Sequence, residues 1–319
     1  MAIYSPAISL AERPSLSRHD VAQVGSDVFG AVGAVKPLTG GSNPDIFSVQ
    51  GDAGNGVLKF FPEGSRLAEF EAASMRRASD AGIPAPEIFG EGVLETEAGD
   101  RPWVAMEHAA GKPLSELVQS DSDRESTLRS IGRLIAELHM NSRPAPEGFW
   151  RQTDTDDDGK PVWRFSGWHE YLTNMEETLQ DKAGTLSASG LTNAEIGIIM
   201  KNISEYKSMS PETSVFCHAD LRLEHVGIDQ DNKIVSVIDW GSAQANSPER
   251  EFSKPLTVDD SPMIDSYAES FGTPKKELHE RVRRMQLAHL PALVIFNVEK
   301  NRPEDTLDRV TEVRSLINQ

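Results

Sequence analysis

The stretch of sequence that decides the fold reads Cys-His-Ala-Asp-Leu-Arg-Leu-Glu-His-Val-Gly-Ile-Asp at residues 217–229, followed by Val-Ser-Val-Ile-Asp-Trp-Gly at 235–241. A short apolar run precedes each of the acids Asp220 and Asp239, which places both on loops directly after predicted strands. The turn between the two quoted stretches predicts a hairpin that brings His225 beside Asp239. A carboxylate with a second nitrogen or oxygen donor nearby suits Mg²⁺ that is held together with nucleotide phosphates.

Upstream of these stretches, the first third of the chain predicts a small antiparallel sheet with one helix. Residues 66–81 are good helix formers without proline or glycine, and Gly-Ile-Pro-Ala-Pro at 82–86 ends that helix. Several apolar runs separated by glycine-containing turns predict strands that pair as hairpins. These runs lie at residues 32–38, 46–49, 57–61, 88–94 and 103–107.

Beyond residue 111 the pattern becomes mainly helical. Apolar residues recur at helical spacing and predict a helix over 124–140. The acidic stretch 152–160 reads as a solvated loop. Further helical patterns occur over 163–179, 193–209 and, with two breaks, 259–318.

Taken together, the motif His218-x-Asp220-x-x-x-x-His225 and the later Asp239-Trp240-Gly241 resemble the catalytic and metal-binding loops of the aminoglycoside phosphotransferase family. In that family, which has a protein-kinase-like fold, the usual pattern is His-Gly-Asp-x-x-x-x-Asn followed by Ile-Asp-Trp/Phe-Gly. Other segments resemble parts of the family in the same order over most of the chain, from about residue 32 to 316. They are the glycine-rich loop 39–43, the strand 57–59, the helix and turn 71–86, the hinge 103–111 and the helix end 134–139.

The resemblance implies an α+β fold of two lobes, as in protein kinases. Residues 1–107 would form a nucleotide-binding lobe with a small antiparallel sheet and one helix. Residues 108–319 would form a larger, mainly helical lobe that carries catalysis and binds the acceptor.

The resemblance also implies roles for the residues of the two loops. Asp220 would accept or orient the proton of the acceptor hydroxyl, Arg222 would meet the γ-phosphate, and Asp239 with His225 would hold Mg²⁺. His225 stands where most members have Asn. An imidazole can still ligate a divalent ion through a nitrogen, although Mg²⁺ prefers oxygen. The same His is also found in macrolide and aminoglycoside 2″-phosphotransferases. Ala219 replaces the usual glycine, and we expect this residue to keep the backbone out of the φ > 0 region. His218 is expected to brace the loop through hydrogen bonds.

A second group of residues is implied to bind the nucleotide. Lys59 would bind the α- and β-phosphates and pair with a helix carboxylate, which the pattern assigns to Glu71, with Glu69 as the alternative. The phosphate-covering loop would use Gly40, Gly41 and Ser42, and the backbone at Glu107 and Ala109 would meet the base. The resemblance implies ATP or GTP as the donor. Recognition of the base by backbone groups of the hinge does not choose between the two.

Composition limits the partners. With 32 basic and 50 acidic residues among 319, the formal charge is −18, which argues against nucleic acid or an anionic membrane and favours a cationic small molecule. A single cysteine, Cys217, excludes an internal disulfide. The first ten residues lack the features of a signal peptide, and no apolar stretch is long enough to span a bilayer. We therefore expect a cytoplasmic protein, as either a monomer or a homodimer.

The sequence thus predicts a Mg²⁺-dependent kinase that transfers the γ-phosphate of ATP or GTP to a hydroxyl of a small molecule. An aminoglycoside-like antibiotic is the favoured acceptor, with resistance as the consequence, and Asp259, Asp260 and Glu269 are candidate acceptor-binding acids. A macrolide kinase, or a housekeeping kinase of choline, homoserine or a thio-sugar, is the alternative, because fold alone does not choose. A non-catalytic protein of the same fold would be expected to lack one of Lys59, Asp220 or Asp239, and none is missing.

Overall fold

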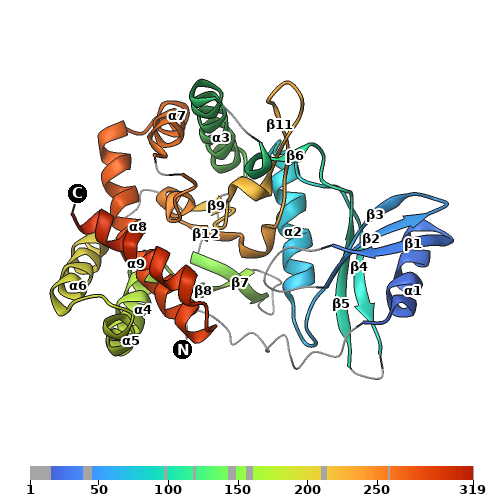
Figure 1. The fold of residues 1–319 in the computed structure, drawn as a ribbon, viewed down its shortest axis with the longest axis horizontal. Coiled ribbons are helices and arrows are strands. Elements are labelled where there is room, and N and C mark those ends of the chain that lie inside the picture. The colour runs from blue at the N-terminus through green and yellow to red at the C-terminus, as the bar shows by residue number, and fades with distance from the viewer. Residues whose placement is uncertain are drawn as a thin grey trace. The chain divides into compact units, whose positions relative to one another are not determined.

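The predicted strands of the first third form one antiparallel sheet in the order β1-β2-β3-β5-β4 (Figure 1). The computed structural model describes residues 16–38, 45–96, 99–117, 120–142, 149–155, 161–209, 214–257 and 259–318. The strands of this sheet are β1 (Val32–Pro37), β2 (Asp45–Gly51), β3 (Asn55–Phe60), β4 (Ile88–Leu94) and β5 (Arg101–Met106).

Among the described residues, two helices pack with this sheet, one more than the sequence predicts. Helix α2 (Leu67–Asp80) is the predicted helix, whereas α1 (Arg18–Phe29) was not recognised. A reciprocal capping box between Ser17 and Asp20 starts α1, and its apolar side chains join a core with residues of β2 and β3. The apolar positions of α1 are mostly valine, a weak helix former, so packing against the sheet outweighs local propensity there.

A short three-stranded sheet positions the loops that carry the motifs. Its strands β6 (Lys112–Pro113), β10 (Val226–Ile228) and β11 (Ile234–Val237) are ordered β11-β10-β6. Strands β10 and β11 form the predicted hairpin, whose turn is held by the Asp229 carboxylate accepting the N–H groups of Asp231 and Lys233, both at 2.9 Å.

A third sheet corrects the interpretation of residues 152–179. It has the order β8-β7-β12-β9 and contains β7 (Phe149–Thr155), β8 (Pro161–Phe165), β9 (Val215–Cys217) and β12 (Gln244–Asn246). The predicted acidic loop therefore begins as a strand, and the helix expected from residue 163 begins at Trp168. Pairing with β12, which lies far away in sequence, stabilises β7 despite its polar composition. Residues 156–160 of the acidic stretch lie outside the described part.

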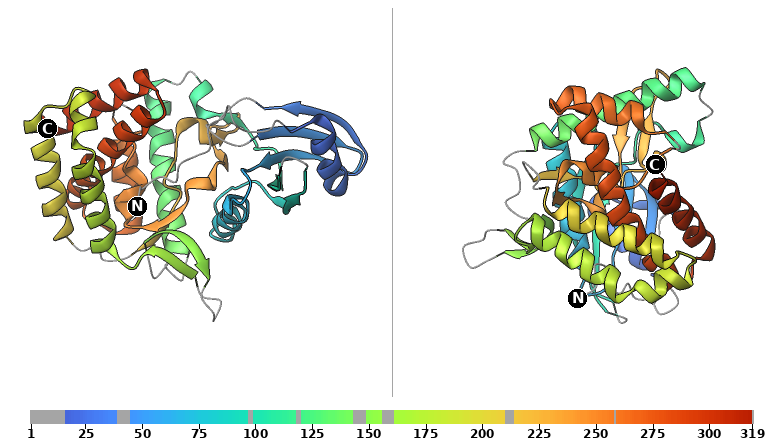
Figure 2. Two further views of the ribbon diagram at one scale, coloured as in Figure 1. Left: turned by 90° about the horizontal axis from the view of Figure 1, so that it is seen from below. Right: turned by 90° about the vertical axis from the view of Figure 1, so that its left-hand side faces the viewer.

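From residue 121 on, the described residues contain seven α-helices. In both views of Figure 2, α4 (Trp168–Asp181), α5 (Ala183–Ala188) and α6 (Asn193–Lys207) lie beside α8 (Lys275–Glu299) and α9 (Pro303–Ile317), around a shared apolar core. Helices α3 (Asp121–Asn141) and α7 (Ser261–Phe271) pack directly against each other. Gly132 lets them approach closely, because a β-carbon there would lie 2.2 Å from the Met263 carbonyl oxygen.

The chain separates into two compact units, each described by itself. The described residues of Pro6–Val118 and Arg222–Ser242 form one unit, and those of Gln119–Leu221 and Ala243–Gln319 form the other. The boundary between residues 107 and 108 stays a prediction for the two lobes. The α+β, protein-kinase-like fold class is confirmed.

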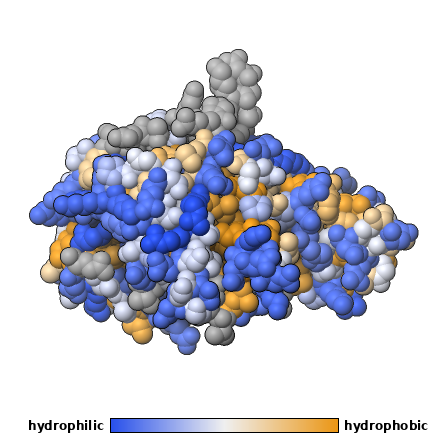
Figure 3. All heavy atoms as spheres, turned by 90° about the horizontal axis from the view of Figure 1, so that it is seen from above, coloured by the Kyte–Doolittle hydropathy of each residue, from blue (hydrophilic) through white to orange (hydrophobic). Residues whose placement is uncertain are grey.

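The surface of the described residues carries six exposed large apolar side chains. Figure 3 shows mostly hydrophilic residues on the visible face, with apolar patches between them. No helix in the described part of the chain is both long and apolar enough to cross a membrane. Among the described residues, the large apolar side chains that are exposed are Leu38, Phe89, Val93, Ile198, Val298 and Leu307.

Candidate active site

A buried lysine bridges two carboxylates in the unit that contains the five-stranded sheet. The Lys59 ammonium on β3 lies 2.7 Å from Glu71 Oε1 on α2 and 3.0 Å from Asp239 Oδ1 after β11. Burial alone would lower the pKa of Lys59, but the two carboxylates outweigh it and raise that pKa. The lysine therefore carries a positive charge that is held in place from two sides.

The structure distinguishes between the two candidate partners on α2. Glu71 lies on the buried face of the helix with Ala68, Ala72 and Met75, whereas Glu69 is exposed and pairs with Arg66. The helical repeat explains this difference, because residues two positions apart lie on different faces. Glu71 is thus the carboxylate that pairs with Lys59.

Gly241 leaves room for the Glu71 carboxylate. A β-carbon at Gly241 would lie 3.1 Å from Glu71 Oε2, closer than an ordinary van der Waals contact. The glycine of the Asp239-Trp240-Gly241 motif therefore has a steric role. Trp240 is fully buried and donates its indole N–H to the Val237 carbonyl at 2.9 Å, as expected of a packing residue.

The β10–β11 hairpin brings His225 and Asp239 together, as the sequence predicted. His225 Nε2 lies 3.6 Å from Asp239 Oδ2, and the Ile238 N–H donates to the His225 carbonyl at 3.0 Å. Asp239 has φ +64°, a left-handed conformation that Asp tolerates better than most residues. The Asp239 side chain keeps 41% of its surface exposed and the His225 side chain 13%, so the Asp239 carboxylate is the more accessible of the two donors. This donor set fits a divalent cation bound together with phosphate oxygens.

In the other unit, the loop after β9 presents Asp220. The Asp220 N–H lies 3.3 Å from His218 Nδ1, and His218 is buried, which agrees with a bracing role for this histidine. Ala219 has φ +65°, so the expectation that alanine would keep the backbone out of this region is wrong. The conformation costs about 1–2 kcal/mol for a residue with a β-carbon, and the surrounding contacts hold the loop in it.

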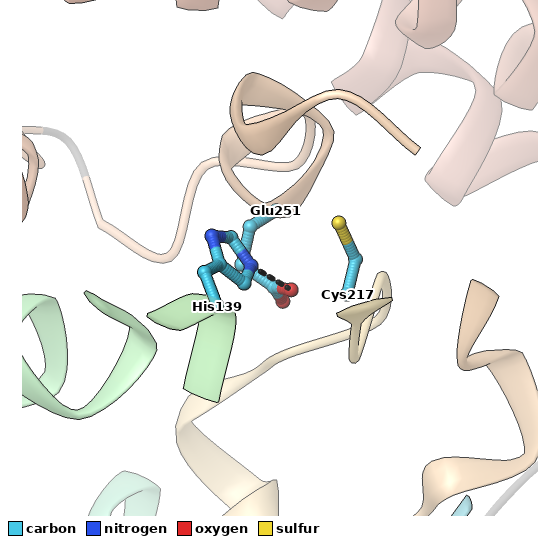
Figure 4. A group of neighbouring side chains, drawn as sticks. All are labelled: His139, Cys217 and Glu251. Carbon is cyan, nitrogen blue, oxygen red and sulfur yellow. Dashed lines mark ion pairs between the residues drawn. The ribbon is translucent and has the colours of Figure 1, made fainter. Parts of the chain in front are cut away.

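Those contacts come from a buried carboxylate behind the loop. Glu251 accepts the N–H groups of His218 at 2.7 Å and Ala219 at 3.2 Å. Figure 4 shows Glu251 facing the His139 ring, whose Nε2 lies 3.8 Å from the carboxylate, with Cys217 beside them. The Tyr267 hydroxyl lies 2.9 Å from His139 Nδ1. The Glu251 carboxylate thus forms the main support behind the loop.

The ionisation of Glu251 and Cys217 argues that this cluster is structural. Burial would raise the pKa of Glu251, but the neighbouring His139 and His218 groups outweigh it and lower that pKa. Burial and the nearby Glu251 charge raise the pKa of the Cys217 thiol well above its usual value. A protonated thiol and a carboxylate already occupied by backbone N–H groups make poor metal ligands.

Asp220 also has an ion-pair partner that the sequence did not indicate. The Lys254 ammonium lies 2.5 Å from Asp220 Oδ1, and both side chains are largely buried. Neither Lys254 nor Glu251 falls in a recognised motif, and both lie more than 30 residues from the loop they contact. No periodicity or spacing in the sequence links these positions, so sequence reasoning missed them.

The remaining predicted residues are placed as follows. Arg222 is about half exposed and lies 3.3 Å from Glu224, so its role at the γ-phosphate stays a prediction. Glu107 follows β5 and donates its N–H to the Glu87 carbonyl at 2.8 Å. The Ala109 N–H has no hydrogen-bond acceptor among the described residues, which leaves it available to a nucleotide base. Gly40, Gly41 and Ser42 lie outside the described residues.

The candidate acceptor-binding acids have protein partners. The Asp260 carboxylate accepts the N–H groups of Leu256 at 2.7 Å and Thr257 at 2.9 Å, and burial raises its pKa. Asp259 accepts the Ser261 N–H, and Glu269 pairs with Lys275. Asp260 therefore shapes a turn, and a role for any of the three in acceptor binding stays a prediction.

Comparison with known proteins identifies the family. The model of the phosphotransferase enzyme family matches residues 34–292, and the chain belongs to that family. It is therefore a small-molecule kinase, as predicted. No curated protein sequence matches the chain.

Solved structures share the fold at low sequence identity. A thermostable mutant of the aminoglycoside phosphotransferase APH(4)-Ia, in complex with ADP and hygromycin B, is 16% identical with a TM-score of 0.72, over 94% of this chain and 98% of that one. APH(2″)-IIIa with GDP and kanamycin is 12% identical with a TM-score of 0.66, over 93% and 98%. A putative fructosamine-3-kinase from Haemophilus somnus 129PT is 17% identical with a TM-score of 0.61, over 92% and 96%. At these identities the likeness concerns the fold alone.

Proposed function

We propose that this phosphotransferase moves the γ-phosphate of ATP or GTP to a hydroxyl of a cationic, aminoglycoside-like antibiotic. The observation that carries the proposal is the buried Lys59, held between Glu71 and Asp239 with His225 beside Asp239. Phosphoryl transfer depends on positioning and charge neutralisation, and this arrangement provides fixed charges of both signs. The donor nucleotide is cytoplasmic, so the enzyme would act there.

The nucleotide would be bound by the unit with the five-stranded sheet. Lys59 would bind the phosphates, and the N–H of Ala109 with the carbonyl of Glu107 would meet the base. The loop with Gly40, Gly41 and Ser42, which lies outside the described residues, keeps its predicted role over the phosphates. Related structures contain ADP or GDP, which supports a nucleoside triphosphate donor without choosing the base.

Asp239 and His225 would hold the divalent ion, for which we propose Mg²⁺. When bound, the ion would supply positive charge to the phosphates. In the reaction, the bond from the γ-phosphorus to the β–γ bridging oxygen breaks, and the acceptor oxygen bonds to the γ-phosphorus. Asp220 would take the proton of the acceptor hydroxyl, and Arg222 would meet the transferred phosphate.

Two observations support a cationic antibiotic as the acceptor. The chain has a formal charge of −18, which attracts polycations. Two of the similar structures contain the aminoglycosides hygromycin B and kanamycin. A second candidate function, phosphorylation of a sugar-derived metabolite, is favoured by the similarity to the putative fructosamine-3-kinase.

The experiment that tests the proposal measures release of nucleoside diphosphate with Mg²⁺ and ATP or GTP. Hygromycin B, kanamycin, a macrolide, choline, homoserine and a fructosamine serve as separate acceptors. The Asp220→Asn variant is the control for chemistry. We expect acceptor-dependent release with an aminoglycoside, and a loss of about 10²–10⁴-fold in the variant, the usual contribution of a general base.

Each result has a defined meaning. Release with only a metabolite would replace the antibiotic proposal by the second candidate. Full activity of the Asp220→Asn variant would contradict the assigned mechanism. Growth of a susceptible bacterial host that expresses the gene, on the antibiotic that reacts in the assay, tests whether the activity confers resistance.

A further inference from the structure

The proposed function leaves one contact of Asp220 unexplained, its ion pair with Lys254. The amine lies 2.5 Å from Asp220 Oδ1, and the side chains are 16% and 19% exposed. Surface ion pairs contribute little because both partners remain solvated, but a largely buried pair at this distance holds its two groups in defined positions. Asp220 is the carboxylate to which the proposed function assigns the proton of the acceptor hydroxyl.

Lys254 is fixed by its neighbours along the chain. It follows the short 3-10 helix η5 (Pro248–Phe252), where the Phe252 carbonyl accepts a hydrogen bond from Gln286 of α8 at 2.9 Å. On the other side, the Asp260 carboxylate holds the N–H groups of Leu256 and Thr257. The backbone that presents the amine is therefore anchored both before and after it.

One segment supports Asp220 in two ways. Glu251 accepts the backbone N–H groups of the two residues before Asp220, and Lys254, three positions later, contacts its side chain. Burial, with Arg250, Lys254 and Arg309 nearby, holds the pKa of His289 well below its usual value. His289 is therefore neutral near pH 7.

We propose that Lys254 is a positioning residue for Asp220, fixing its carboxylate in the orientation that receives the proton of the acceptor hydroxyl. The inference rests on the proposed function and adds a residue to it. Lys254 itself exchanges no atom in the reaction: the proton passes from the acceptor oxygen to Asp220. Such a residue acts mainly on kcat, because nucleotide binding does not require the Asp220 carboxylate to be aligned.

The first test measures the contact without any substrate. We propose a double-mutant cycle made of the wild type, Lys254→Met, Asp220→Asn and the double variant. The quantity compared is the equilibrium constant of unfolding by denaturant. Two residues in direct contact should show a coupling of about fivefold or more. Lys201→Met is the matched control, because Lys201 belongs to the same unit and is 77% exposed, and it should show no coupling with Asp220→Asn. A coupling below about twofold would overturn the contact.

The second test separates positioning from a merely structural role. Using the acceptor from the panel above that releases diphosphate, Lys254→Met should lower kcat by about ten- to a hundredfold, the usual effect of a misplaced catalytic group. ADP affinity, measured by calorimetry, should stay within about twofold, and Lys254→Arg should restore part of kcat. A Lys254→Met variant that couples to Asp220 but keeps its kcat would overturn the positioning role. If the wild type transfers phosphate to no acceptor, the proposed function fails and the positioning role fails with it, while the cycle still decides the contact.

Discussion

At the scale of single residues, Lys59 illustrates how a buried charge is held in position by its partners. Lys59 would be costly to bury alone, and Glu71 and Asp239 offset that cost at 2.7 and 3.0 Å. Removing one partner leaves a buried charge with less compensation. The identity of the helix carboxylate is therefore open to a sharp test, because its neighbour Glu69 provides a control on the same helix.

We predict that Glu71→Gln lowers kcat/KM for the nucleotide by about ten- to a hundredfold, because Lys59 would no longer be held against the phosphates. Glu69→Gln should change it by less than about twofold, since Glu69 forms only an exposed pair with Arg66. Steady-state kinetics with varied nucleotide measure both values. Similar losses in the two variants would contradict the pairing of Lys59 with Glu71.

The buried Glu251 predicts a pH dependence of stability. Its folded pKa is lowered from the usual value of 4.5, so its stabilising effect is fully present above about pH 4.5 and is lost as the pH falls through the folded pKa. Glu251→Gln should therefore cost about 1–3 kcal/mol of unfolding free energy at pH 7, because two buried N–H groups lose a charged acceptor.

Urea unfolding at pH 7 and at decreasing pH measures this effect. The difference between wild type and Glu251→Gln should shrink below pH 4.5. Glu205→Gln, at a half-exposed position on α6, is the control and should change the unfolding free energy by less than about 0.5 kcal/mol. A difference that grows on acidification would show that Glu251 does not stabilise the loop as a carboxylate.

At the scale of secondary structure elements, most helices and strands follow from local patterns, and the misses share one cause. Helix α1 has a start signal in its Ser17–Asp20 capping box but mostly valine at its apolar positions, and strand β7 is polar. Both are stabilised by partners elsewhere in the chain. The close packing of α3 against α7 is equally invisible in sequence. Gly132 lies within a predicted helix, where glycine is otherwise unfavourable.

We predict that Gly132→Ala destabilises the fold by about 1–3 kcal/mol, because its β-carbon would meet the Met263 carbonyl at 2.2 Å and force α3 and α7 apart. The same substitution at Gly197, in the middle of α6 with no atom within 4 Å of the added carbon, should stabilise by up to about 1 kcal/mol. Thermal or urea unfolding gives the sign. A stabilising Gly132→Ala would mean that α3 and α7 do not approach as closely as described.

At the scale of the whole molecule, the excess of acidic residues bears on acceptor choice. A net charge of −18 creates a field that attracts cations, and salt screens it over about 10 Å at 0.1 M. We predict that KM for a polycationic aminoglycoside rises about fivefold or more between 0.05 and 0.5 M salt, whereas KM for a neutral acceptor changes little. Kinetics at constant nucleotide concentration measure this. An unchanged KM for the polycation would remove charge as an argument for the acceptor.

The sequence by itself determined the fold class, the family, and the order of Lys59, Glu71, Asp220 and Asp239 along the chain. These features are readable because residue types at short spacing, such as His218-x-Asp220 and Asp239-Trp240-Gly241, directly reflect local loop chemistry. The hairpin that joins His225 to Asp239 was predictable for the same reason, since a tight turn links two adjacent strands.

Only the tertiary structure decided which groups surround these residues. It selected Glu71 over Glu69 by helix face, put Ala219 in a left-handed conformation, and revealed Lys254 and Glu251 as partners of the Asp220 loop. The contacts of Lys254 and Glu251 with the Asp220 loop join positions more than 30 residues apart. Their energies depend on burial and distance, which no local pattern encodes.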